Sequence, residues 1–235
     1  MAMFCGTRLA KVAFPSATCV TVAVVGVILS AAAQSASAAT LELHVRDRDG
    51  RGVPDVVVVA AATEPARSAP SPATKPAVMD QHDRRFVPQV LVVQTGTPVS
   101  FPNNDTVSHQ VYSFSPVRRF QLPLYKGEAH SPVAFDTAGL VVLGCNIHDE
   151  MVGYIYVADS PYFARTDADG NAEIDDVPAG SYRLDAWGPR VADSGETLVR
   201  KVTLERQATV VAEWNLQRPL RPHPSPGPRD VDWDY

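Results

Sequence analysis

Gly144-Cys-Asn-Ile-His-Asp-Glu-Met151 is the stretch of this 235-residue chain that decides its predicted fold. It places a thiol, an imidazole and a thioether at Cys145, His148 and Met151, in one loop between two strand-like runs. Copper that alternates between Cu(II) and Cu(I) needs ligands acceptable to both states. Two imidazoles, a thiolate and a long axial thioether meet that need. The loop therefore predicts three ligands of a copper site and leaves one histidine to be found elsewhere.

The fourth predicted ligand is His109. It follows an apolar strand and an Asn-rich turn in the stretch Val99-Ser-Phe-Pro-Asn-Asn-Asp-Thr-Val-Ser-His-Gln-Val-Tyr112. Taken alone, Cys145 reads as an inert buried thiol, Met151 as core packing and His109 as a surface histidine. Taken together, the four positions favour a metal site. The remaining histidines lack comparable context and are assigned to solvent or packing: His44, His82, His130 and His223.

Other chemistries fit these residue types less well. A Cys-His nucleophile pair needs an orienting group and an oxyanion site, and the sequence suggests neither. Zinc accepts His and Cys, but a thioether is a poor zinc ligand. Haem attachment and iron–sulfur clusters require more cysteines. The Asp-x-Asp-Gly segments at 47–50 and 167–170 lack the later ligands of a calcium loop, so they are predicted to be hairpin turns.

The two ligand segments resemble those of the cupredoxins. Residues 99–112 are similar to the first-histidine region of plastocyanin, amicyanin and pseudoazurin, and the Cys-x-x-His-x-x-Met spacing is that of amicyanin. The resemblance spans residues 79–158 and implies a Greek-key β-sandwich with one type 1 copper ion. The whole arrangement also looks like bacterial proteins labelled methylamine utilization proteins. Gln110 and Asp149 depart from the residues that cupredoxins often carry after the two histidines, so the resemblance does not fix the reduction potential.

After residue 38 the chain is predicted to be all-β. Residues 41–46 alternate apolar and polar, which is typical of a half-buried strand, and Val56–Ala62 is an apolar run typical of a buried one. No window shows a helical period. Several further short β-prone runs, separated by turn residues, predict a sandwich or barrel. These runs are Val90–Gln94, Val99–Phe101, Gln110–Phe114, Val133–Phe135, Leu140–Leu143 and Gly153–Ala158.

Two segments flanking the copper region resemble parts of one module. Residues 41–62, with the turn DRDGRGVPDV, look like the opening strands of a carboxypeptidase regulatory-like (prealbumin/Ig-like) β-sandwich, and residues 166–187 look like its next strands. Since long insertions in loops cost little closure entropy, we interpret the copper domain as an insertion. A single enlarged sandwich is the alternative. The predicted parts are a split sandwich of residues 39–62 plus 164–216, a Pro-rich linker at 63–78, the copper domain at 79–163 and a disordered Pro-rich tail at 217–235.

Residues 1–38 have the pattern of a signal peptide. Arg8 and Lys11 precede the apolar run Cys19–Ala33, and Ala36-Ser-Ala38 is a small-x-small cleavage pattern. The apolar run is shorter than the roughly 20 residues of a spanning helix; an uncleaved anchor is the alternative. We expect a mature chain that starts near Ala39, is not inserted in a membrane and lies in the periplasm, with Cys145 as its only cysteine.

The predicted function is one-electron transfer rather than catalysis. A closed four-ligand site leaves no position for a substrate, and the resemblance implies His148 as the electron port. Asp149 and Glu150 follow His148, which predicts a redox partner with a basic patch. The net charge of −5 and the lack of a Lys/Arg cluster argue against a nucleic-acid partner. A copper storage or delivery protein and a cell-envelope interaction module with structural copper remain as alternatives.

Overall fold

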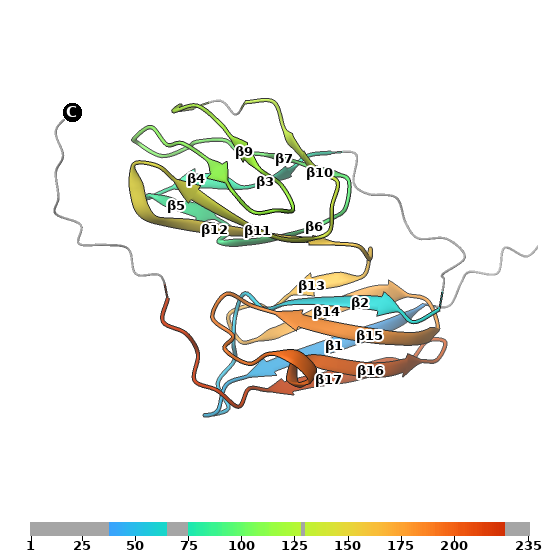
Figure 1. The fold of residues 1–235 in the computed structure, drawn as a ribbon. Coiled ribbons are helices and arrows are strands. Elements are labelled where there is room, and N and C mark those ends of the chain that lie inside the picture. The colour runs from blue at the N-terminus through green and yellow to red at the C-terminus, as the bar shows by residue number, and fades with distance from the viewer. Residues whose placement is uncertain (1–37, 65–74, 128–129, 224–235) are drawn as a thin grey trace, which may run out of the picture. The chain divides into compact units, whose positions relative to one another are not determined.

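The computed structural model describes residues 38–64, 75–127 and 130–223. Within these ranges the chain consists of strands, turns and a single 3₁₀ turn, η1 (Gly195–Leu198), so the all-β prediction is confirmed (Figure 1). The described part of the chain contains no helix of the length and apolarity needed to cross a membrane. Apart from Ala38, the predicted signal peptide lies outside the described residues, as do the middle of the predicted linker and the end of the predicted tail.

The first sandwich is built from both ends of the described chain (Figure 1). One sheet has the order β14 (Asn171–Val177), β1 (Ala39–Arg46), β17 (Thr209–Asn215), and the other has the order β13 (Phe163–Arg165), β2 (Val57–Ala62), β15 (Gly180–Trp187), β16 (Val199–Leu204). Strand β1 runs antiparallel to β14 and parallel to β17, and β2 runs antiparallel to both β13 and β15. Residues 39–62 therefore complete sheets whose other strands all come from residues 163–215.

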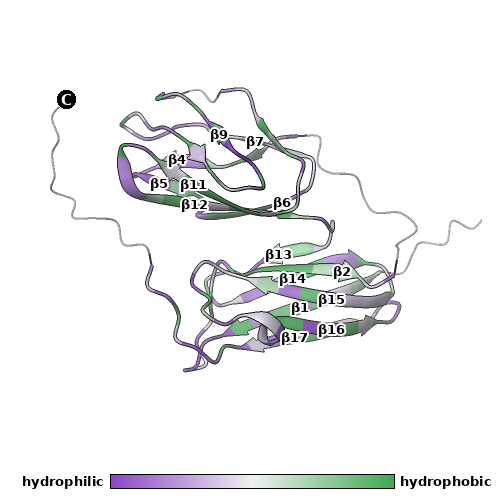
Figure 2. Cartoon of the chain, viewed as in Figure 1, coloured by the Kyte–Doolittle hydropathy of each residue, from purple (hydrophilic) through white to green (hydrophobic). Residues whose placement is uncertain are grey.

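The alternating sequence of β1 explains how the first core forms. Leu41, Leu43 and Val45 are fully buried, while the residues between them are half-buried. Side chains of a strand alternate between its two faces, so one face of β1 is committed to the core. All members of this core lie in residues 39–60 and 162–220, among them Leu184 and Trp214. Figure 2 shows hydrophobic residues concentrated along the strands and hydrophilic ones in the connecting turns.

The second sandwich is formed by the residues between β2 and β13. Its larger sheet has the order β6 (Val90–Gln94), β12 (His148–Ala158), β11 (Gly139–Cys145), β8 (Tyr112–Ser113), β9 (Phe120–Gln121). The smaller sheets are β10 (Val133–Phe135), β7 (Thr97–Ser100), β3 (Ala77–Val78) and the hairpin β4 (Asp80–His82), β5 (Arg85–Val87). Its core draws on residues 77–157 alone, including Phe101, Phe135 and Ile155.

Strand β2 is buried on both of its faces. Val58 and Ala60 belong to the first core, whereas Val57 and Val59 lie in a separate small cluster. A strand covered on both faces has apolar residues at successive positions, which is why apolar and polar residues do not alternate in Val56–Ala62. The small cluster comprises Val57, Val59, Val90 and Ala158, with Tyr154, Tyr156, Phe163 and Trp187 among the partly buried side chains packed against it.

Three predicted boundaries differ from the structure by a few residues. The predicted linker extends to residue 78, yet Ala77–Val78 is strand β3 and pairs with β7. The predicted copper domain extends to residue 163, yet Phe163 pairs with Val59 of the first sandwich. The tail was expected to be disordered from Gln217. In the structure the backbone N–H groups of Gln217 and Arg218 donate to the carboxylate of Asp193, so the chain stays attached at this point.

The two Asp-x-Asp-Gly segments form tight turns. The Asp47 carboxylate accepts the backbone N–H groups of residues 49 and 51, and the Asp167 carboxylate accepts those of residues 169 and 171. Each turn ends in a glycine with a left-handed backbone, at φ 77° for Gly50 and 71° for Gly170. Glycine adopts this conformation without a steric penalty, which accounts for the Asp-x-Asp-Gly pattern.

Candidate metal centre

Cys145 and His148 lie at the two ends of a tight hairpin. Cys145 is the last residue of β11 and His148 is the first residue of β12, and the two are paired directly opposite each other. The sequence predicted a longer loop, but only Asn146 and Ile147 lie between the strands. Residues opposite each other on antiparallel strands have neighbouring side chains. The hairpin therefore turns a spacing of three in the sequence into a contact between the two ligands.

Glycine at position 144 allows a close approach of Tyr112 to the hairpin. A Cβ atom on Gly144 would lie 2.7 Å from the ring of Tyr112, which pairs with Gly144 from β8. No larger residue fits there unless that ring moves. Tyr112 comes from the segment that follows His109, so this close approach packs the segment carrying the first histidine against the strand carrying Cys145.

A bulge in the same hairpin places Met151. The register between β11 and β12 shifts between Gly144, which pairs with Val152, and Cys145, which pairs with His148. The additional residues of β12 are 149 to 151. Bulges of this kind re-aim side chains and are common beside functional sites. Residues 149 and 150 are both exposed, whereas Met151 is 2% exposed and lies in the same core cluster as Cys145.

His109 is fully buried and held by the main chain. Its backbone N–H donates to the carbonyl of Tyr125, and the N–H of Tyr125 donates to the carbonyl of His109, at 2.9 and 3.0 Å. Two reciprocal hydrogen bonds fix the position of this residue between strands β7 and β8. A surface histidine, the alternative interpretation for this position, is inconsistent with its 0% exposure.

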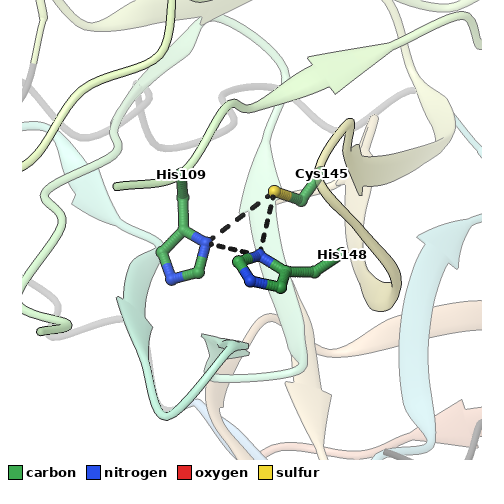
Figure 3. A group of neighbouring side chains, drawn as sticks. All are labelled: His109, Cys145 and His148. Atoms are coloured by element: carbon green, nitrogen blue, oxygen red, sulfur yellow. Dashed lines mark hydrogen bonds between the residues drawn. The ribbon is translucent and has the colours of Figure 1, made fainter. Parts of the chain in front are cut away.

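Two imidazole nitrogens and one thiol sulfur, from His109, His148 and Cys145, face one another across a small gap (Figure 3). His109 Nδ1 and His148 Nδ1 are 3.1 Å apart, and Cys145 Sγ is 3.7 Å from each of them. The point equidistant from these three atoms lies about 2 Å from each, close to the length of a bond from a transition metal to imidazole or thiolate. The arrangement thus fits a trigonal metal site without rearrangement.

The environment of Cys145 favours the thiolate. Burial by itself raises the pKa of this thiol, but its contact with the His109 ring and the hydrogen bonds from the backbone N–H groups of Gln110 and Ile147 outweigh it, and the pKa is lowered. The thiolate is the form that binds metals. Gln110, where the sequence departs from the cupredoxin pattern, contributes through its main chain, so this hydrogen bond does not depend on which side chain stands there.

Asp105 belongs to the centre and is not among the four residues predicted from the sequence. Its Oδ2 accepts a hydrogen bond from His109 Nε2 at 2.8 Å, and its side chain is 6% exposed. Burial lowers the pKa of His109, but the contacts with Cys145 and Asp105 outweigh it and the pKa is raised. Its signal in the sequence is a carboxylate four residues before His109, within the Asn-rich turn.

His148 is half-buried and is the most exposed member of the group. Its pKa is lowered, first by burial and then by the positive charges of His109 and Arg84. Its neighbour Ile147 is 51% exposed. The other histidines lie outside this group: His44 bonds to Asn171, His82 pairs with Asp83, His130 contacts the Tyr125 ring edge-on and His223 is exposed.

Neither a protein-family profile nor a curated protein matches this chain. Solved cupredoxins resemble part of it. The purple cupredoxin from Nitrosopumilus maritimus is 21% identical, with 35% of this chain and 99% of that chain covered and a TM-score of 0.33. A mutant of amicyanin in its reduced state is 23% identical, with 43% and 98% covered and a TM-score of 0.34. A copper-containing nitrite reductase from Thermus scotoductus is 25% identical, with 42% and 25% covered and a TM-score of 0.34.

Proposed function

We propose that this protein is a periplasmic one-electron carrier with a single type 1 copper ion bound by His109, Cys145, His148 and Met151. The trigonal arrangement of two imidazole nitrogens and one thiol sulfur, with 3.1 and 3.7 Å between them, carries the proposal. Copper supplies one-electron chemistry when it is bound, and His₂Cys sites with a weak axial Met are typical of electron-transfer copper. The protein contributes the ligands and their fixed positions.

The way the ligands are held supports a carrier more than a catalyst. A reciprocal backbone pair holds His109, and a two-residue hairpin holds Cys145 and His148. Ligand atoms fixed in this way move little when the charge of the metal changes, and small movements favour fast electron exchange. His109 and Cys145 are buried and His148 is half-buried, so the edge of the His148 ring is the proposed route for electrons.

Loading the purified mature protein with Cu(II) tests the proposal. We expect an intense blue band from thiolate-to-copper charge transfer, a type 1 EPR signal and reversible reduction. Cys145→Ser should abolish the band, because the charge-transfer donor is lost. Ser113→Ala is a suitable control, since Ser113 is also buried in this sandwich but does not belong to the ligand group. An unchanged spectrum in Cys145→Ser contradicts the assignment. Ready transfer of copper to an apo acceptor without reversible reduction indicates storage or delivery instead.

The proposed compartment has a separate test. Strand β1 begins at Ala39, directly after the predicted cleavage pattern, so cleavage there leaves the whole strand in the mature chain. We expect N-terminal sequencing of the periplasmic protein to start near Ala39. A soluble cytosolic form that retains Met1 contradicts this part of the proposal and leaves the copper assignment untouched.

A further inference from the structure

Asp105 is a buried carboxylate bonded on several sides. Its Oδ2 accepts His109 Nε2 at 2.8 Å and the backbone N–H of Arg84 at 2.6 Å. Its Oδ1 accepts the backbone N–H of Thr106 at 2.6 Å. Asp105 is 9% exposed, so solvent and salt screen its charge less than that of a surface carboxylate. Both of its oxygens therefore accept a backbone N–H group, and a carboxylate that only accepts hydrogen bonds fits this arrangement.

The contact with Asp105 determines which nitrogen of His109 is free. A neutral imidazole carries its proton on one ring nitrogen, and the hydrogen bond made by that nitrogen selects the tautomer. Because an ionised carboxylate only accepts hydrogen bonds, the proton is on Nε2. The lone pair is then on Nδ1, the atom that faces Cys145 Sγ at 3.7 Å and His148 Nδ1 at 3.1 Å.

We propose that Asp105 is a positioning residue of the copper centre that holds His109 in the Nδ1-binding tautomer and stabilises Cu(II) over Cu(I), thereby lowering the reduction potential. The inference rests on the proposed copper function. A carboxylate bonded to a ligating histidine raises the basicity of that ligand. Its charge also attracts the doubly charged ion more strongly than the singly charged one.

The position of Asp105 does not depend on His109. The backbone N–H of Arg84 comes from the turn of the β4–β5 hairpin, where Asp83 and Arg84 have left-handed backbones with φ of 49° and 57°. The N–H of Thr106 comes from the loop that leads to His109. The loop is braced further by Asn103, which accepts the N–H of Asp105. Two segments thus fix the charge before a metal binds.

Asp105→Asn removes the charge with little change in volume, and Asp80→Asn is its matched control. The Asp80 carboxylate also holds a backbone N–H, that of Gln81, and the side chain of Asn104, but neither partner is a ligand. We expect Asp105→Asn to bind Cu(II) roughly 10- to 100-fold more weakly. Its affinity for Cu(I) should fall less. For each factor of ten by which the loss of Cu(II) affinity exceeds the loss of Cu(I) affinity, the reduction potential rises by about 59 mV. Asp80→Asn should leave the potential unchanged.

A purely structural role for Asp105 gives a different result. A brace for the loop would weaken Cu(II) and Cu(I) binding equally and leave the potential where it is, and this outcome overturns the inference. ¹⁵N NMR of the metal-free wild-type protein gives a readout that needs neither copper nor a variant. We expect the proton of neutral His109 on Nε2; a proton on Nδ1 overturns the inference even where Asp105→Asn does not fold. A wild-type protein that fails to bind copper refutes the proposed function instead, while the tautomer measurement still decides the role of Asp105.

Discussion

Cys145 shows how single contacts set the chemistry of the centre. The thiol is 2% exposed, and burial alone keeps a thiol protonated. The backbone N–H groups of Gln110 and Ile147 and the ring of His109 reverse that effect. Two of these three contacts come from the main chain, so they depend on the shape of the hairpin and of the His109 segment rather than on the choice of side chains. The fold itself therefore prepares the ligand.

Met151→Leu should keep copper bound but raise the reduction potential. The thioether is a weak axial donor that favours Cu(II), and leucine removes the donor while conserving the volume of a side chain that is 2% exposed. Swaps of this kind in a core usually cost less than about 1.5 kcal/mol, so the fold should survive. Cyclic voltammetry of the two proteins measures the difference. A potential equal to that of the wild type would show that Met151 does not act as a ligand.

Asp105 should make the stability of the metal-free protein depend on pH in the acid range. Burial raises the pKa of its carboxyl, but hydrogen bonds from the Arg84 N–H, His109 and the Thr106 N–H outweigh burial and lower it. The folded state is therefore stabilised above the unfolded pKa of about 3.9 and loses this stabilisation as the pH falls toward the folded pKa. Urea unfolding of wild type and Asp105→Asn should differ most above about pH 4 and converge below it. A difference that stays constant down to pH 3 contradicts this assignment.

The residues of the centre were predictable from the sequence to different degrees. Cys145 and His148 are three positions apart, so their type and spacing alone indicate a site. The contacts of Asp105 with Arg84 and of His109 with Tyr125 join different loops, and no local pattern encodes them. The thioether of Met151 indicates a copper ligand from the sequence, but the bulge that precedes its buried position depends on the pairing of β11 with β12.

The strands of the second sandwich were predicted to different degrees. Strands β6 and β10 have the predicted bounds, Val90–Gln94 and Val133–Phe135. The β4–β5 hairpin was not predicted, because β4 has the sequence Asp-Gln-His and contains no β-branched or aromatic residue. Yet the turn of this hairpin supplies the Arg84 N–H to Asp105. A short element with almost no sequence signal thus supports the centre.

Phe86 packs this hairpin against β12 at Gly153, where the absence of a side chain leaves space for the Phe86 ring. A Cβ atom at position 153 would lie 2.8 Å from three carbon atoms of Phe86. Gly153→Ala should therefore destabilise the protein by about 1–3 kcal/mol, the usual cost of overpacking, and weaken copper binding through the displaced hairpin. Urea unfolding and Cu(II) titration measure both effects. In a Phe86→Leu background the cost of Gly153→Ala should be smaller; an equal cost in both backgrounds shows that the clash is not with Phe86.

We propose that charges around His148 steer a partner with a basic patch. Asp149 and Glu150 are exposed beside it, while Arg84 adds a positive charge near the same ring. Such charges act mainly on the association rate and are screened within about 10 Å at 0.1 M salt. Asp149→Asn with Glu150→Gln should slow electron exchange at low salt, and Arg84→Gln should speed it. Stopped-flow rates across a salt series measure this, and a flat dependence in the wild type refutes the proposal.

The two cores suggest that the first sandwich can fold without the second. Every member of the first core lies in residues 39–60 or 162–220, and every member of the second lies in residues 77–157. The chain leaves and re-enters the first sandwich at neighbouring points, because the Ser160 hydroxyl donates to the carbonyl of Ala60 and Phe163 pairs with Val59. A short turn in place of residues 64–159 therefore closes the sheet at little entropic cost.

We expect this shortened chain to fold but to associate. Val57 and Val59 are at most 5% exposed in the full chain, and the removal of Val90 and Ala158 uncovers them beside Trp187. Exposed apolar patches of this kind drive association. Circular dichroism should show cooperative unfolding of β-structure, and size-exclusion chromatography should show oligomers of the shortened chain. Val57→Thr with Val59→Thr should restore the monomer, because neither side chain contributes to the first core. A shortened chain that is unfolded, with or without these substitutions, would mean that the first sandwich needs the inserted residues for its stability.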